Sequence, residues 1–259
     1  MLEHSRKNIK GNKDIHSPAR MDHWYESPLG DYLAQHIKQY LDQILATCFG
    51  YYAIQIGSNP LPEALLSGCR VKHVFHLGQH QQHQHADINP ALLPIATDST
   101  DLVILNHTLS QFPDPHALLR EVNRVLIPDG KLIIIDFNPV SLWGMRHLFQ
   151  SWLEEAPWGG HYYTARRLKD WTSLLGFELL SHYRCGYVLP MNFQSLIDKS
   201  GILSKFFGRW FKFSAAINIL EFEKNTIPLT PFRKRWVKQR IIPPGVIRPS
   251  VGRGMKYDK

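Results

Sequence analysis

The fold is decided by residues 92–139, "LLPIATDSTDLVILNHTLSQFPDPHALLREVNRVLIPDGKLIIIDFNP". Two runs in this stretch, "LVIL" and "LIII", are apolar without polar alternation, which is typical of parallel strands covered on both faces. The segment between them, "PHALLREVNRVL", predicts a helix, and Pro115 suits its first turn. A strand, a helix and a strand in this order predict one right-handed unit of a doubly wound sheet.

Strands and helices alternate on both sides of this stretch. Before it we expect a helix with apolar residues at 33–45, a strand at 51–57, a helix at 61–68, a strand at 71–78 and an extended piece at 85–89. After it we expect a helix that ends near 176, a strand that follows directly, and a last strand at 216–224. The chain is therefore predicted to have an α/β fold with a mostly parallel sheet.

Length and charge suggest one large domain with appendages. We expect a disordered polar N-terminus at 1–20, an α/β domain at 21–224 with a helical insertion at about 191–213, and a basic tail rich in proline and glycine at 225–259. The net charge of +8 is concentrated at the ends, since residues 224–259 carry +9 and residues 1–20 carry +3. Contact with nucleic acid or an anionic surface would therefore act through the tail.

Several classes of site and location are disfavoured. The sequence has no run of about 18 apolar residues and no secretory signal, so we expect no transmembrane segment and a cytoplasmic location. The three cysteines lie far apart and are expected to be buried thiols. Five histidines cluster in the sequence but lack a fixed second set of ligands, so no metal site is expected there: His73, His76, His80, His83 and His85.

Three stretches together resemble the class I S-adenosylmethionine-dependent methyltransferases, in particular their small-molecule methyltransferase-like branch. They are "LLPIATDSTDLVILNHTL", "LLREVNRVLIPDGKLIII", in which Asp129 replaces a glycine, and the final strands "GFELL" and "AINILEFEK". The similarity covers about residues 50–224. It implies a Rossmann-like sheet of seven strands and S-adenosylmethionine as the cofactor.

The loop "QIGSNPL" after the first strand departs from that family's pattern of one acid and three glycines. Gln55 stands at the acidic position, Gly57 at the first glycine, Asn59 at the second and Leu61 at the third. Glycine matters here because a backbone without Cβ can take positive φ and lie against a ligand, and asparagine tolerates such φ angles next best. The resemblance implies that Gly57, Ser58 and Asn59 face the amino-acid end of the cofactor.

Further cofactor contacts follow from the same resemblance. Gly78 stands where the family places an acid that binds the ribose, and Gln79 beside it could make one such bond. Asp87 is similar to the acid that accepts a hydrogen bond from the adenine amino group. Asn106 and His107 stand where the family faces the sulfonium and the methyl acceptor.

His107 is the candidate catalytic residue. A methyl acceptor often has to lose a proton, and an imidazole, with an ordinary pKa of about 6.5, can accept one at neutral pH. The other interpretation is a histidine that only caps the strand end. Asp136 and Asn138 also follow a strand, and Trp24 and Tyr25 form either a lid over the cofactor or ordinary packing.

Two functions remain open. The first is methyl transfer from S-adenosylmethionine to a small-molecule or lipid-like acceptor. The alternative is an inactive protein of the same fold that binds RNA or a membrane surface through its basic tail, which the changed loop residues favour. A nicotinamide-dependent oxidoreductase is disfavoured, because its loop needs several glycines against a pyrophosphate. The acceptor and the oligomeric state are not indicated by the sequence.

Overall fold

The computed structural model of the protein describes residues 18–58, 66, 68–78, 86–87, 89, 92–150, 157–188 and 215–225. The predicted polar N-terminus up to residue 17, most of the predicted helix at 61–68, the helical insertion and the basic tail lie outside the described residues.

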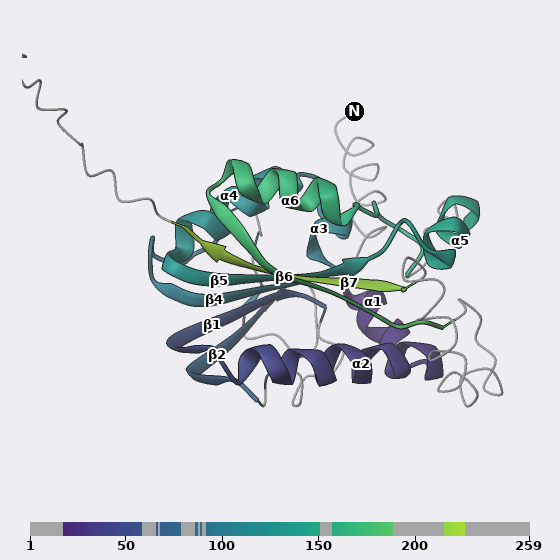
Figure 1. Ribbon diagram of the computed structural model, residues 1–259, viewed down its shortest axis with the longest axis horizontal. Helices are drawn as coiled ribbons and strands as arrows, with labels where there is room; N and C mark the ends of the chain where they lie inside the picture. Colours follow the sequence, from purple (N-terminus) through teal and green to yellow (C-terminus); the bar gives the residue numbers. More distant parts are fainter. Residues whose placement is uncertain are drawn as a thin grey trace, which may run out of the picture. The chain divides into compact units, whose positions relative to one another are not determined.

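Seven strands of the described chain form one sheet, in the order β3-β2-β1-β4-β5-β7-β6 (Figure 1). Five neighbouring strands from β3 to β5 are parallel, and β7 runs antiparallel to both β5 and β6. The strands are β1 (Phe49–Gly57), β2 (Arg70–Gly78), β3 (Ala86–Asp87), β4 (Thr100–Asn106), β5 (Leu126–Phe137), β6 (Phe177–Cys185) and β7 (Ile217–Lys224). This confirms the predicted α/β, doubly wound, mostly parallel sheet.

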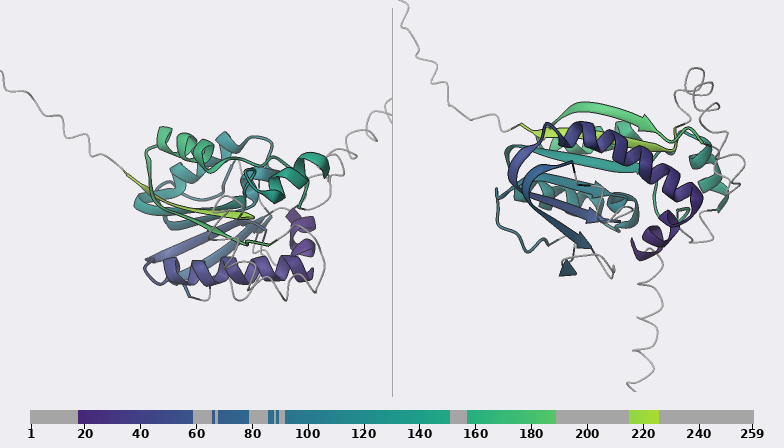
Figure 2. Two further views of the ribbon diagram at one scale, coloured as in Figure 1. Left: turned by 45° about the vertical axis from the view of Figure 1, so that its right-hand side comes forward. Right: turned by 90° about the horizontal axis from the view of Figure 1, so that it is seen from below.

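Helices cover both faces of the sheet, with α2 on one face and α4 and α6 on the other (Figures 1 and 2). The helices are α1 (Pro18–Tyr25), α2 (Pro28–Leu45), α3 (Thr108–Gln111), α4 (Pro115–Val125), α5 (Leu142–Gln150) and α6 (Ala165–Leu174). Each face has its own apolar core, so the central strands are buried on both sides. Because both faces of β4 and β5 are buried, these strands have unbroken apolar runs in the sequence.

The sequence did not predict α1 and α5, and it placed the end of β4 too late. Both helices are short and lack a regular apolar period, so only their tertiary packing identifies them. β4 was expected to continue to 109, but it ends at Asn106 because His107 has a φ of +53° and turns the chain into α3. Asp129 has a φ of +62°, which explains why the related family has a glycine in this turn.

Gly57, the last residue of β1, lies directly against the end of β4. Its φ is +100°, and a Cβ atom at this position would overlap Thr108 Oγ1 and the carbonyl oxygen of Asn106. In the sheet, Gly57 pairs with Asn106. Residue 57 therefore has to be a glycine because of the protein's own β4, independently of any ligand.

We predict that Gly57→Ala destabilises the fold more than Gly176→Ala. Gly176 also has a positive φ of +86°, but a Cβ atom there would only touch the Asn225 carbonyl oxygen at 3.5 Å. We expect a loss of about 1 kcal/mol in the free energy of unfolding for Gly176→Ala and about 3 kcal/mol for Gly57→Ala, because overlap adds to backbone strain. Urea unfolding of both variants measures the difference, and equal losses would contradict the close contact of β1 and β4.

The three cysteines are unequally buried. Cys48 and Cys185 are buried, as expected, but Cys69 is only half-buried because it stands in the turn before β2. Burial raises the pKa of Cys48 to about 11 and that of Cys185 to about 12.

We predict that iodoacetamide alkylates Cys69 first in the native protein. Alkylation requires the thiolate, and a thiol with the pKa of Cys185 is about one ten-thousandth ionised at pH 8. Peptide mass mapping over time measures the order, and unfolding in guanidinium should equalise the three rates. Native labelling of Cys185 as fast as that of Cys69 would contradict its burial.

Candidate active site

The ends of three parallel strands bring the predicted residues together. Gly57 of β1 is aligned with Asn106 of β4, and Asn106 with Ile135 of β5. His107 and Asp136 come directly after this row. The carboxyl edge of a doubly wound sheet, where these residues lie, is where ligands of such folds bind.

Ser58 is fixed in the turn after β1 by hydrogen bonds from two side chains. Its carbonyl oxygen accepts bonds from Asn106 Nδ2 at 2.9 Å and from Gln55 Nε2 at 3.0 Å, while its own N–H donates to the Asn106 carbonyl at 3.1 Å. Gln55 is the residue that replaces the acid of the related family. An ionised acid could not donate to this carbonyl, so the amide supports the loop in a different way.

Two polar atoms at this turn are buried and have no hydrogen-bond partner within the described part of the chain. They are Ser58 Oγ and Asn106 Oδ1. A buried polar atom without a partner costs about 1–3 kcal/mol, and native structures keep few of them, so a bound polar ligand is a natural explanation. A hydroxyl and an amide oxygen fit the carboxylate and the ammonium of S-adenosylmethionine's amino-acid end, respectively.

His107 lies at the centre of the site and is fully buried. Its N–H donates to the Ile135 carbonyl at 2.9 Å, which holds the left-handed turn after β4. One ring nitrogen, Nε2, is 2.6 Å from the hydroxyl oxygen of Tyr25, and the other, Nδ1, is 3.6 Å from Asp136 Oδ1. The same Asp136 oxygen accepts the Phe137 N–H at 2.9 Å. The ring therefore faces two side chains instead of capping the strand end.

Aromatic rings surround His107. The His107 ring stacks on Phe137, with 4.4 Å between centroids. Phe137 in turn stacks on Trp143 and Tyr162, and Trp24 meets Phe137 and Trp143 edge-on. Water is therefore largely kept away from His107, which strengthens each polar interaction at this position.

Two tyrosines of the site, the buried Tyr25 and the partly buried Tyr162, are held neutral. Burial raises the pKa of the Tyr25 and Tyr162 hydroxyls well above the usual value, and the charge of Asp136 acts in the same direction on both. Sequence reasoning did not identify Tyr162, because it lies between α5 and α6 in a segment without a motif.

Trp143 and Asn138 have structural roles. Trp143 is fully buried, and its Nε1 donates to the Val188 carbonyl at 2.9 Å. Asn138 Nδ2 donates to the Ala215 carbonyl at 3.0 Å, and the Asn138 backbone N–H donates to the Ala216 carbonyl. This residue therefore joins the end of β5 to the start of β7.

The other predicted cofactor residues are only partly described. Gly78, at the end of β2, pairs with Asp87 of β3, which places the Asp87 backbone beside the position that lacks the family's acid. The Asp87 side chain, Asn59 and Gln79 lie outside what the structure describes.

The described chain has no group of three or more His, Cys, Asp or Glu residues that could hold a metal ion, although His80, His83 and His85 fall outside it. None of its helices is long and apolar enough to cross a membrane.

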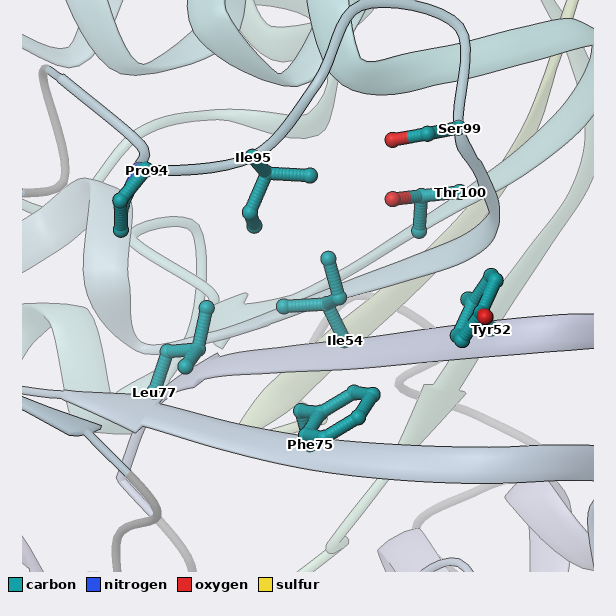
Figure 3. A pocket seen from close by; sticks show the side chains of 8 residues that line it. All are labelled: Tyr52, Ile54, Phe75, Leu77, Pro94, Ile95, Ser99 and Thr100. Atoms are coloured by element: carbon teal, nitrogen blue, oxygen red, sulfur yellow. The ribbon is translucent and has the colours of Figure 1, made fainter.

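A cavity of about 360 Å³ lies elsewhere, on one face of β1 and β2 (Figure 3). Ile54 and Ile95 point toward one another from its opposite sides (Figure 3). Its lining is mainly apolar: Tyr52, Ile54, Phe75, Leu77, Pro94, Ile95, Ser99 and Thr100. None of the predicted site residues is among them, so this cavity is not the candidate active site.

Comparisons with known proteins agree with the fold. Residues 30–182 match the model of a family described as "Methyltransferase domain". An uncharacterized protein of Escherichia coli, YafS, is 33% identical over 222 residues, which cover 85% of this chain and 88% of that protein. A demethylmenaquinone methyltransferase of Chlamydia pneumoniae is 42% identical over 55 residues, 21% of this chain and 23% of that protein.

A solved structure shows the same fold at low sequence identity. An S-adenosylmethionine-dependent methyltransferase from Mesorhizobium loti superposes with a TM-score of 0.53 and 15% identity, over 71% of this chain and 96% of that one. The family match covers more than half of the chain and supports methyl transfer, with S-adenosylmethionine as the expected cofactor. The chain thus belongs to the methyltransferase domain family that its sequence resembles.

Proposed function

We propose that this chain transfers a methyl group from S-adenosylmethionine to a small-molecule or lipid-like acceptor, with His107 as the base. The observation that carries the proposal is the buried His107–Asp136 pair, which directly follows the row of Gly57, Asn106 and Ile135. A base at this position faces the place where ligands of such sheets bind.

The cofactor, when bound, supplies a methyl group on a cationic sulfur. Gly57, Ser58 and Asn106 would hold it at the ends of β1 and β4, and the unpartnered Ser58 Oγ and Asn106 Oδ1 support this assignment. Gly78 and Asp87 would contact it from the ends of β2 and β3. Asn59 and Gln79 remain predictions from the sequence.

His107 would accept the proton that the acceptor loses. Its Nδ1 faces Asp136, so we assign the ring proton to Nδ1 and the free electron pair to Nε2. Asp136 then orients the ring and stabilises the cation that forms. The distance of 3.6 Å is longer than a hydrogen bond, and such contacts commonly shorten when substrate binds.

The acceptor is proposed to be small because the site is closed by aromatic side chains. The local likeness to a demethylmenaquinone methyltransferase is in keeping with this proposal. Contact of the basic tail with nucleic acid or an anionic surface stays a prediction, since the tail lies outside the described residues.

Calorimetric titration of the full chain with S-adenosylmethionine and S-adenosylhomocysteine tests the proposal. We expect dissociation constants in the micromolar range for both. Absence of heat up to about millimolar ligand would refute a cofactor site and favour the inactive binding protein instead.

We predict that Ser58→Ala weakens binding of S-adenosylhomocysteine about tenfold while it leaves the free energy of unfolding within about 0.5 kcal/mol of wild type. The reason is that Ser58 Oγ has no partner in the described structure, so its loss removes no internal hydrogen bond.

Thr172→Val is the matched control. Thr172 is equally buried, but its hydroxyl donates to the Leu168 carbonyl at 3.0 Å, within α6. This variant should lose stability and keep its affinity. If Ser58→Ala behaves in the same way as Thr172→Val, Ser58 Oγ does not contact the cofactor.

A further inference from the structure

His107 Nε2, the nitrogen proposed to accept the proton, already has a hydrogen-bond partner in the structure. That partner is a phenol, the side chain of Tyr25. Tyr25 is the last residue of α1, and its hydroxyl oxygen lies 2.6 Å from His107 Nε2. The Tyr25 side chain is buried, with 3% of its surface exposed. With the free electron pair assigned to Nε2, the Tyr25 hydroxyl is the donor in this bond.

Packing fixes the backbone of Tyr25. A Cβ atom at Gly30 in α2 would overlap the Trp24 carbonyl oxygen and the Tyr25 Cα atom, so the end of α1 is pressed against α2. Trp24 meets the Tyr25 ring edge-on, with 5.0 Å between centroids. The backbone at the end of α1 is therefore fixed against α2, and the Tyr25 phenol reaches His107 through the two rotatable bonds of its own side chain.

The space around the phenol suits a planar ring. The Tyr25 and His107 rings lie 5.8 Å apart, and Phe137 stacks on the His107 ring with 4.4 Å between centroids. A ligand that replaced the Tyr25 ring would therefore meet aromatic surfaces, which favour another aromatic ring.

The charges near the Tyr25 hydroxyl select against an acidic ligand. Burial raises the pKa of this hydroxyl most, and Cys185, Asp22 and Asp136 raise it further. A carboxylate or phosphate in the same place would be repelled by the two aspartates and would lose its water shell on burial. A neutral hydroxyl avoids both costs.

We propose that the methyl acceptor is a phenol, which displaces the Tyr25 side chain and puts its own hydroxyl on His107 Nε2. This inference rests on the proposed function, because it names the acceptor of the same site. The phenol O–H would give its proton to Nε2 and its oxygen would form the new bond to the methyl carbon. The sulfur–carbon bond breaks, and its electron pair stays on sulfur.

The test uses three probes with the full chain and no cofactor, so that it reads binding and not activity. The probes are 4-ethylphenol, 4-ethylanisole, which has the same ring but no O–H group, and benzylamine, which carries an ammonium. Each is titrated calorimetrically into wild type, Tyr25→Phe and Tyr40→Phe. Tyr40 is the matched control, because its hydroxyl bonds to Ser181 Oγ at 3.2 Å, away from His107.

We expect millimolar binding of 4-ethylphenol to wild type and about tenfold tighter binding to Tyr25→Phe. The gain arises because that variant lacks the competing hydroxyl and leaves Nε2 without a partner. Tyr40→Phe should bind as wild type does, and 4-ethylanisole should bind Tyr25→Phe at least about tenfold more weakly than the phenol.

Several results would overturn the inference. They are no binding of 4-ethylphenol to wild type or Tyr25→Phe up to about 10 mM, equal binding of phenol and anisole, or tighter binding of benzylamine than of the phenol. If S-adenosylhomocysteine still binds in its own titration, such a result refutes only the phenol as acceptor and leaves the proposed methyl transfer in place. Failure of S-adenosylhomocysteine to bind would refute the proposed function itself, and the phenol as methyl acceptor with it.

Discussion

The contact between the ends of β1 and β4 is the constraint on which the site depends. Thr108 Oγ1 donates to the Ile56 carbonyl at 2.6 Å, and Ser58 and Asn106 exchange two further hydrogen bonds. These bonds require the close approach that only a glycine at 57 permits. As a result, the first turn after β1 and the first turn after β4 are fixed against one another, and the polar atoms between them are buried.

The same constraint places His107. β4 has to end at Asn106 to meet Gly57, and the left-handed turn that follows points the imidazole between α1 and the end of β5. Here Asp136 orients one nitrogen and Tyr25 covers the other. A base in such a dry site has few competing partners, so its proton exchange is confined to the group that is placed against Nε2.

Most of the fold could be predicted from the sequence, and the site only in part. The apolar runs of β4 and β5 and the proline at the start of α4 are local signals, and each predicted its element. The support of the Ser58 carbonyl by Asn106 could not be seen, because Asn106 comes from another strand, 48 positions away. Nor could the bond of Tyr25 to His107, which joins residues 82 positions apart.

The central claim is that the buried turn between β1 and β4 holds the cofactor next to His107. The most direct measurement is a crystal structure of the chain with S-adenosylhomocysteine. The account predicts that the ligand contacts Ser58 Oγ or Asn106 Oδ1 and that its sulfur faces His107. A bound ligand that touches neither atom, or that lies in the apolar cavity on β1 and β2, would contradict it.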